Sequence, residues 1–273
     1  MEKIIMKKVK IIVAGLCIVA ISASCTNGTT KNKDKSAASP QATTVKENLK
    51  EDIASINHSA FDKLLKKNVS DKGKVDYAAF VKDKASLEDY ITLLTKINPA
   101  KLSKNEQTAY WINAYNASVI DKIVRNYPTK SILKIDGGKA FDVILPYKFN
   151  GESLSLNDIE KKKLMGSDLF DGRIHFAVNC AAVSCPTLQN QAYTASNIQS
   201  LLTLNTKAAL TNPAFNKISA DKASLSKLFD WYKADFIKAE GSVENFVNKY
   251  SSTKINKNTN ISYMDYNWDL NSK

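Results

Sequence analysis

The sequence predicts an α+β domain in which a mainly antiparallel sheet packs against helices around one buried central helix. Apolar residues recur at helical spacing through much of residues 57–127. Strand signals occur in hairpins and not in a regular alternation with helices. The preceding stretch is too polar to fold, so all predicted elements belong to residues 51–273, which we expect to form a single domain.

Residues 1–24 are predicted to be a secretory signal peptide, because lysines precede an apolar run over residues 11–21 that ends in small residues. The run is shorter than the ~20 apolar residues that a membrane-spanning helix needs. Small residues directly before Cys25 resemble the lipobox of a bacterial lipoprotein, which implies cleavage there and a lipid on the cysteine sulfur. The alternative is an ordinary signal peptide that a cysteine happens to follow.

Residues 25–50 are predicted to be a flexible tether. Residues 26–48 contain no aromatic and a single branched apolar residue, Val45, so they cannot bury enough surface to offset the entropy of ordering. A lipid on Cys25 followed by a polar tether predicts a domain anchored to a membrane in the bacterial cell envelope, facing the periplasm or the exterior.

The chain is basic, but its charges are not arranged for nucleic acid. The formal charge is +12, and four lysines and one glutamate lie in the signal, so the mature chain would keep +9. Lysines are spread along the chain, and the arginines are only Arg125 and Arg173. Nucleic-acid-binding proteins usually cluster basic groups and use arginine forks, so we expect no nucleic-acid partner.

Three helices are predicted in the first half of the domain, and the first two are amphipathic. Two of them lie near residues 56–69 and 86–97. Ser103 and Glu106 have the spacing of a capping box and open the third helix, which Pro128 ends. Apolar residues occur almost all the way round the middle of this third helix, so it is predicted to be the buried central one.

Turn signals follow the third helix. Asn150 and Gly151 stand between short alternating runs and predict a type I′ hairpin. Ser155 and Asp158 form another capping-box pair and predict a short helix that carries Glu160.

A strand is predicted over residues 173–179, "RIHFAVN", because apolar and polar residues alternate there. His175 is expected on the face of this strand opposite the core. Further helices are predicted around residues 201–210 and after Ser242, followed by a C-terminal aromatic run.

Cys180 and Cys185 follow this strand, and they allow three interpretations. In a non-reducing compartment they form a disulfide, although so short a loop restricts the unfolded chain by only about 2 kcal/mol. With His175 they offer zinc only three ligands and lack a Cys-x-x-Cys pair, so we expect no metal and no cofactor.

The third interpretation makes Cys180 a catalytic nucleophile, with His175 as its base and Glu160 as the group that orients the imidazole. The four strand steps from His175 to Asn179 span about 13 Å, so Cys180 cannot touch His175 if the strand stays straight through Asn179. The chain must therefore fold back after Asn179, unless Cys185 is the reactive thiol. The alternative for Glu160 is a solvated acid on a helix surface.

Asn113 and Asn116 lie in the predicted central helix with apolar neighbours on most sides. A buried amide without hydrogen-bond partners costs roughly 1 to 3 kcal/mol, so both must be paired. Either they hold a nearby loop, or they orient substrate and stabilise an oxyanion beside the thiol.

Several motifs together resemble a family called domain of unknown function 547, from about residue 58 to the C-terminus. These motifs are "YWINAYNA", "SLNDIE", "RIHFAVNCAAVSCPTL", "LFDWYKADF" and "YMDYNWDLN". The resemblance carries the family pattern over to Trp111, Asn113, Asn116, Glu160, Arg173, His175, Asn179, Cys180, Cys185 and Pro186. Beside the three catalytic candidates, we predict substrate or oxyanion contacts for Trp111, Asn113, Asn116, Arg173 and Asn179. Ala182 stands where the family usually has serine, which removes one hydroxyl near the turn.

Two function hypotheses follow. The first is a thiol hydrolase or acyltransferase that acts on peptides or peptidoglycan, loosely similar in its ingredients, and distantly in fold, to papain-like and transglutaminase-like enzymes. In papain-like enzymes the cysteine precedes the histidine, the reverse of the order here, so a non-catalytic relative is an alternative. The second is a binding lipoprotein whose turn is shaped by a disulfide between Cys180 and Cys185. A redox role is disfavoured by the spacing of the two cysteines.

Overall fold

A computed structural model describes residues 55–273 of the chain. The predicted signal peptide (residues 1–24), the predicted tether (residues 25–50) with Cys25, and the first four residues of the predicted domain lie outside the described residues. Within the described part, no helix is long and apolar enough to cross a membrane.

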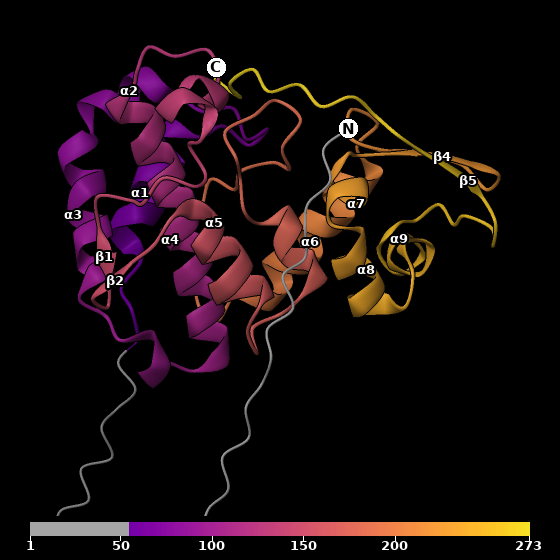
Figure 1. Cartoon of the computed structure of the whole chain (residues 1–273), viewed down its shortest axis with the longest axis horizontal. Coiled ribbons are helices and arrows are strands. Elements are labelled where there is room, and N and C mark those ends of the chain that lie inside the picture. Colours follow the sequence, from indigo (N-terminus) through magenta and orange to yellow (C-terminus); the bar gives the residue numbers. More distant parts are fainter. Residues whose placement is uncertain (1–54) are drawn as a thin grey trace, which may run out of the picture. The chain divides into compact units, whose positions relative to one another are not determined.

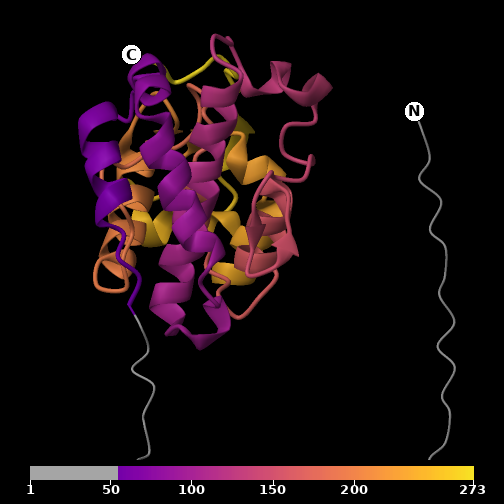
Figure 2. The same ribbon diagram turned by 90° about the vertical axis from the view of Figure 1, so that its left-hand side faces the viewer.

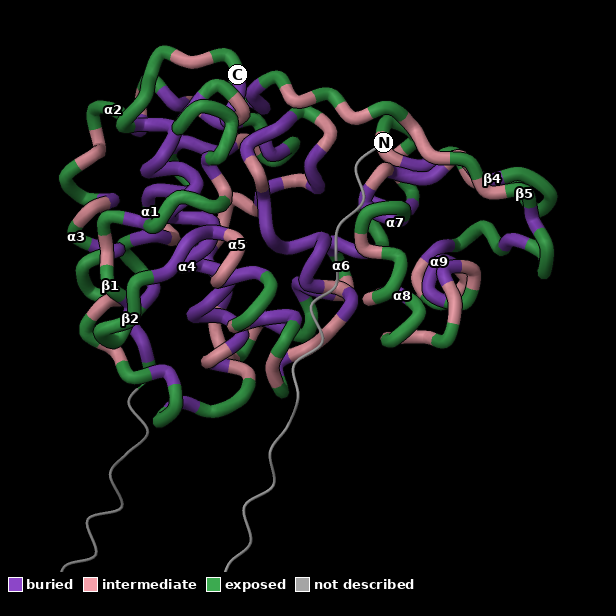
Figure 3. Tube along the Cα trace, in the orientation of Figure 1, coloured by how far each residue is buried: buried purple, intermediate pink, exposed green. Residues whose placement is uncertain are grey.

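The first half of the described chain packs around helix α4, Lys104–Arg125 (Figures 1 and 2). Most residues of α4 are buried, as Figure 3 shows, which confirms the prediction of a buried central helix. The Ser103 hydroxyl accepts a hydrogen bond from the Glu106 N–H, as predicted. The Glu106 carboxylate instead accepts from the backbone N–H groups of Ile56 and Ala195. The elements that precede α4 are α1 (Ser59–Asn68), α2 (Tyr77–Lys82), α3 (Lys84–Thr95) and η1 (Pro99–Lys101).

The turn signals after α4 form the predicted structures. Strands β1 (Lys148–Phe149) and β2 (Glu152–Ser153) pair in antiparallel, and Asn150 and Gly151 between them both have positive φ, of 49° and 81°. Ser155 and Asp158 form a complete capping box. It opens α5 (Leu156–Asp158), which continues into a π-helix, η4 (Ile159–Met165). Two short 3-10 helices, η2 (Ile132–Lys134) and η3 (Asp136–Gly138), precede the hairpin.

The prediction of a strand over residues 173–179 is wrong. This segment begins with a 3-10 helix, η5 (Gly172–Phe176), whose first turn is capped by Asp171. Ile174, His175 and Phe176 are all buried, so no face is exposed. Successive residues of a 3-10 helix point about 120° apart, and Ile174 and Phe176 accordingly pack into different hydrophobic clusters. The alternation in sequence reflects these separate environments and not a pleated strand.

The C-terminal part builds a second hydrophobic cluster, centred on Phe176, Phe229, Phe236 and Phe246. A small mixed sheet lies beside it, in which β4 pairs with β3 in antiparallel and with β5 in parallel. The fold class is α+β, as predicted, with helices predominating. The elements are α6 (Ile198–Thr211), β3 (Lys217–Ile218), β4 (Lys222–Leu225), α7 (Leu228–Trp231), α8 (Lys233–Glu240), α9 (Val243–Tyr250) and β5 (Asn260–Tyr263).

Residues 264–273 form a C-terminal strap that runs back from β5 toward α2, drawn in yellow in Figure 1. The strap holds the segment after η5 through the Val183 N–H, which donates to the Asp269 carbonyl. It reaches the N-terminal helices through the Val75 N–H, which donates to the Asn271 carbonyl. The strap thereby brings residues from the end of the chain beside the two cysteines.

Candidate active site

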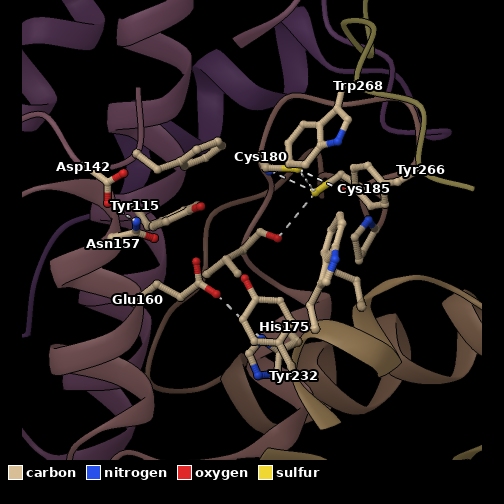
Figure 4. Close-up of a pocket in the computed structure, with 15 residues that line it drawn as sticks. Tyr115, Asp142, Asn157, Glu160, His175, Cys180, Cys185, Tyr232, Tyr266 and Trp268 are labelled. Atoms are coloured by element: carbon tan, nitrogen blue, oxygen red, sulfur yellow. Dashed lines mark hydrogen bonds and ion pairs between the residues drawn. The ribbon is translucent and has the colours of Figure 1, made fainter. Parts of the chain in front are cut away.

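A cavity of about 240 Å³ lies between α4, η4, the turn after η5, α7 and the strap (Figure 4). The thiols lie beside Tyr266 and Trp268 in one part of it, and Glu160 and His175 lie in another. The three predicted catalytic residues thus share one cavity. Its walls are formed by Tyr115, Phe141, Asp142, Asn157, Glu160, His175, Val178, Cys180, Cys185, Pro186, Leu228, Trp231, Tyr232, Tyr266 and Trp268.

The chain does fold back after Asn179. The Asn179 side chain spans the turn, because its Oδ1 accepts from the Ala181 N–H at 2.9 Å and its Nδ2 donates to the Pro186 carbonyl at 2.8 Å. Ala181 has a φ of 62°, in the left-handed region that alanine rarely adopts. This turn brings the two sulfurs, both free thiols, to 2.9 Å from each other, and the Cys180 N–H donates to Cys185 Sγ at 2.9 Å.

The two thiols differ in acidity. Burial acts to raise the pKa of Cys180, but hydrogen bonds with Cys185, Tyr266 and the Ala182 backbone outweigh burial and lower it below its usual value. The Tyr266 hydroxyl lies 3.0 Å from Cys180 Sγ, and its own pKa is raised by burial and by the sulfurs, so it stays protonated. Burial raises the pKa of Cys185 well above its usual value. Cys180 is therefore the thiol that ionises first.

His175 is held by Asp235 and by aromatic rings. Its Nε2 lies 3.0 Å from Asp235 Oδ2, and its ring stacks on Tyr232 with centroids 3.9 Å apart. Its Nδ1 is buried and has no hydrogen-bond partner among the described residues. Glu160, the predicted orienting acid, approaches this nitrogen only to 3.8 Å. The carboxylate that fixes the imidazole is thus Asp235.

No hydrogen bond among the described residues joins His175 to either sulfur. The thiols bond to each other and to Tyr266, while His175 bonds to Asp235. The expectation of a direct contact between thiol and imidazole is therefore wrong. Cys180 and His175 both line the cavity, so a molecule bound there can lie between them.

Glu160 is buried in the π-helix η4, and its side chain lines the cavity. Burial raises the pKa of both Tyr232 and Tyr115, and the charge of Glu160 raises both further. π-helical turns are rare and are frequent at functional sites. Glu160 is thus a carboxylate within the cavity and not a solvated acid on a helix surface.

The asparagines of α4 bind backbone. Asn116 Nδ2 donates to the Ala177 carbonyl at 3.0 Å, and its Oδ1 accepts from the Asn179 N–H at 2.8 Å. Asn113 pairs in the same two-sided way with the backbone of Tyr193. Asn116 and Asn179 therefore fix the cysteine turn, and Asn113 fixes a different segment. None of these three asparagines, which were predicted to contact substrate or an oxyanion, lines the cavity.

Trp111 and Arg173, both predicted to contact substrate, also lie outside the walls of the cavity. Trp111 packs against Phe149 of the hairpin, with ring centroids 6.1 Å apart. Arg173 binds the Asp171 carboxylate and donates to the Thr203 hydroxyl at 2.8 Å, so it joins η5 to α6. The structure brings neither side chain to the thiols.

A zinc site would require His175 to approach both cysteines. Within residues 55–273, no group of three or more His, Cys, Asp and Glu side chains is arranged to hold a metal ion.

Sequence reasoning missed four residues of the site. Tyr232 and Asp235 come from the motif "LFDWYKADF", and Tyr266 and Trp268 come from "YMDYNWDLN". Both motifs are among those on which the resemblance drawn from the sequence rests. The residues within these motifs do not show which side chains reach the site. Their positions are set by the packing of α8 and by the path of the strap.

Comparison with known proteins supports the resemblance drawn from the motifs. Residues 99–208 match a family described as "Protein of unknown function, DUF547". The match includes α4, Glu160, His175 and both cysteines, and it ends before Asp235 and the strap. No curated protein and no solved structure matches the chain.

Proposed function

We propose that the protein is a thiol-dependent hydrolase or acyltransferase in which Cys180 attacks the carbonyl carbon of a peptide-like substrate. One observation carries this proposal: a half-buried thiol with a lowered pKa shares a cavity with a histidine that is fixed by a carboxylate. A thiol with a lowered pKa forms the nucleophilic thiolate more readily, and the reaction then needs a proton donor for the leaving group. Cys180 supplies the first and His175 the second.

The first step forms an acyl-enzyme. The Cys180 thiolate adds to the carbonyl carbon, and the bond between that carbon and the leaving nitrogen breaks. This step requires the packing around the buried Nδ1 of His175 to open to the substrate. His175, protonated with Nε2–H directed to Asp235, then gives the Nδ1 proton to the departing amine. This step makes a thioester on Cys180 and a neutral imidazole.

The second step releases the acyl group. Water, or an acceptor amine in the transferase case, attacks the thioester carbon and gives a proton to Nδ1 of His175. The bond from carbon to sulfur breaks, and the Cys180 thiolate is regenerated. Asn116 and Asn179 are positioning residues in this scheme, because they hold the turn that carries the nucleophile.

The walls of the cavity favour a substrate that bears an amino group. The charged lining includes the carboxylates of Asp142 and Glu160, and no Lys or Arg is found among the described residues that line the cavity. Trp231 and Trp268 add aromatic faces with centroids 5.9 Å apart, and such faces attract ammonium groups. Peptides and peptidoglycan stems with a free amine fit this chemistry.

We further propose that the protein is exported and anchored by a lipid on Cys25, which would place the cavity in the bacterial cell envelope. The support is the sequence of residues 1–25. In a bacterial host, radioactive palmitate should label the full chain but not a Cys25→Ala variant. Equal labelling of the wild type and the Cys25→Ala variant would refute a lipid anchor on Cys25.

The thiol mechanism is tested by trapping the acyl-enzyme. Reduced full-length protein is mixed with an amine-bearing peptide p-nitrophenyl ester at pH 7, and the intact mass is measured. The wild type should gain one acyl group on Cys180, and Cys180→Ser should gain none. Val183→Ala is the matched control, because Val183 lies in the same turn, is exposed, and does not line the cavity.

Acylation that persists in Cys180→Ser would refute the role of this residue. If no peptide ester acylates the wild type, the second hypothesis gains support. Binding of the same peptides, measured by calorimetry, would then indicate a peptide-binding protein without thiol chemistry.

A further inference from the structure

The two cysteines lie closer together than acyl transfer needs. Their sulfurs are 2.9 Å apart, whereas a disulfide bond is about 2.05 Å long. Bond formation therefore requires a shift of less than about 1 Å. A thiol protease needs a single sulfur, so the second cysteine calls for its own explanation.

The two sulfurs lie in different environments, which suit the two different roles of the cysteines in a dithiol pair. Cys180 is half-buried, and Tyr266 holds its sulfur with a hydrogen bond of 3.0 Å. Cys185 is buried, and its sulfur accepts a hydrogen bond from the Cys180 N–H. A more accessible, acidic thiol that attacks and a buried thiol that resolves are the division of labour in thiol–disulfide exchange. The lower pKa of Cys180 and the raised pKa of Cys185 agree with it.

The turn is held in shape without a bond between the sulfurs. Asn179 spans it, Asn116 binds its entry, and the strap accepts the Val183 N–H and, at Asn267, the Ser184 N–H. The contact between the thiols therefore does not depend on a disulfide. A turn that is already held by these hydrogen bonds while the thiols are free suits reversible closure and not a permanent staple.

We infer that Cys180 and Cys185 form a reversible dithiol–disulfide couple that exchanges with an organic disulfide entering the cavity. The Cys180 thiolate attacks one sulfur of R–S–S–R′, the S–S bond breaks, and R′–S⁻ leaves and takes up a proton. The Cys185 thiol then loses its proton and attacks Cys180 Sγ of the mixed disulfide. R–S⁻ leaves and takes up that proton.

The balance is a two-electron exchange. The two cysteines are oxidised to one disulfide, and R–S–S–R′ is reduced to two thiols. The reverse reaction oxidises a dithiol substrate. This activity does not depend on the proposed acyl transfer, and the disulfide form lacks the nucleophile that acyl transfer needs, so the two activities exclude each other.

The inference is tested with oxidised glutathione as the disulfide. Reduced full-length protein is exposed to it at pH 7, alkylated, and digested, and the peptide of residues 174–207 is weighed. The wild type should lose both alkylatable thiols and carry no glutathione. Cys185→Ser should accumulate glutathione on Cys180, and Cys180→Ser should react at least about tenfold more slowly. An excess of reduced glutathione should then restore both thiols in the wild type.

Three results would overturn the inference. One is that the wild type forms no internal disulfide. Another is that Cys185→Ser clears glutathione as fast as the wild type. The third is that the internal disulfide survives a large excess of reduced glutathione, which would make it a structural staple. Circular dichroism verifies that each serine variant is folded, and Cys185→Ala repeats the test if the serine is not tolerated at the buried position.

The two proposals fail separately. The acyl-enzyme test uses reduced wild-type protein and reads an acyl mass on Cys180. The exchange test reads the loss of two thiols. Acylation without exchange would leave only the enzyme proposal standing, and exchange without acylation would leave only the dithiol couple.

Discussion

The two histidines of the chain have similar burial and similar local partners but lie in different surroundings. Each ring is buried, each has one nitrogen within hydrogen-bond distance of a polar side chain, and each has another nitrogen near a glutamate. His58 has Tyr90 Oη at 2.7 Å and Glu106 Oε1 at 3.7 Å. His175 has Asp235 at 3.0 Å and Glu160 at 3.8 Å. Only the second of these rings lines the cavity that holds the thiols.

The comparison shows that burial and polar partners do not identify a catalytic histidine. His58 lies among α1, α3 and α4, where Asn113 also lies 3.2 Å from its Nδ1. Burial lowers the pKa of His58 to about 4, so it stays neutral at physiological pH and ties helices together. What distinguishes His175 is that its ring lines the cavity that holds the thiols.

The largest effect is expected from removing each imidazole in turn. His175→Ala should lower the acylation rate by about 10² to 10⁴-fold, the usual contribution of a general acid or base. His58→Ala should leave the rate of the folded fraction unchanged, while it destabilises the fold by about 2 to 4 kcal/mol through a cavity and unpaired polar groups. Burst kinetics with the peptide ester and urea unfolding measure the two quantities. An equal loss of acylation rate in folded His58→Ala would contradict the assignment of His175 as the catalytic histidine.

The second prediction concerns pH and the stability that His58 controls. Its pKa is about 4 in the folded state and 6.5 for a histidine exposed to water, so between these values the unfolded chain binds a proton that the folded chain does not. Stability should therefore fall as the pH drops from 6.5 to 4, by up to about 3 kcal/mol, and this loss is absent above pH 6.5. Urea unfolding at about pH 7 and about pH 4.5 measures it.

His58→Gln isolates this contribution, because carboxylates also titrate over part of the range. The difference in unfolding free energy between wild type and His58→Gln should shrink toward acid pH, since the variant has no proton to take up there. A difference that does not change with pH would show that His58 is already charged in the folded protein.

The third prediction separates the carboxylates beside the two rings. Asp235→Asn removes the charge that supports protonated His175, so the acylation rate should fall roughly 10- to 100-fold while the protein stays folded. Glu106→Gln, beside His58, is the matched control and should leave that rate unchanged. If Glu160→Gln lowers the acylation rate and Asp235→Asn does not, then Glu160, as predicted from the sequence, and not Asp235 orients the imidazole.

The parts that sequence could predict are those with a local cause. Asn150 and Gly151 specify their hairpin by backbone preference, and Ser155 with Asp158 specifies a helix start. Helix α4 was predictable as the central helix because apolar residues surround it. Each of these signals lies within a few residues of the structure that it produces.

The parts that sequence could not predict depend on distant segments. The alternation of residues 173–179 resembles a strand, but η5 contributes to two hydrophobic clusters, one of which includes α4 and the other α8. Asp235 reaches His175 from 60 positions away, and Tyr266 reaches Cys180 from 86. The sequence therefore identified the cysteines and His175 as candidate site residues, but it could not identify Asp235 and Tyr266 as their hydrogen-bond partners.

The smallest effect is expected from removing one hydroxyl at each site. Tyr266→Phe deletes the hydrogen bond to Cys180 Sγ, so the pKa of Cys180 should rise and less thiolate should exist at neutral pH. Alkylation of Cys180 by iodoacetamide at pH 7 should slow by roughly 3- to 10-fold, and the difference should vanish at alkaline pH, where both proteins are ionised. Tyr90→Phe deletes the matching hydroxyl beside His58 and should leave alkylation unchanged at every pH. Equal alkylation profiles for Tyr266→Phe and the wild type would mean that Cys185 and the turn, and not the strap, set the acidity of the nucleophile.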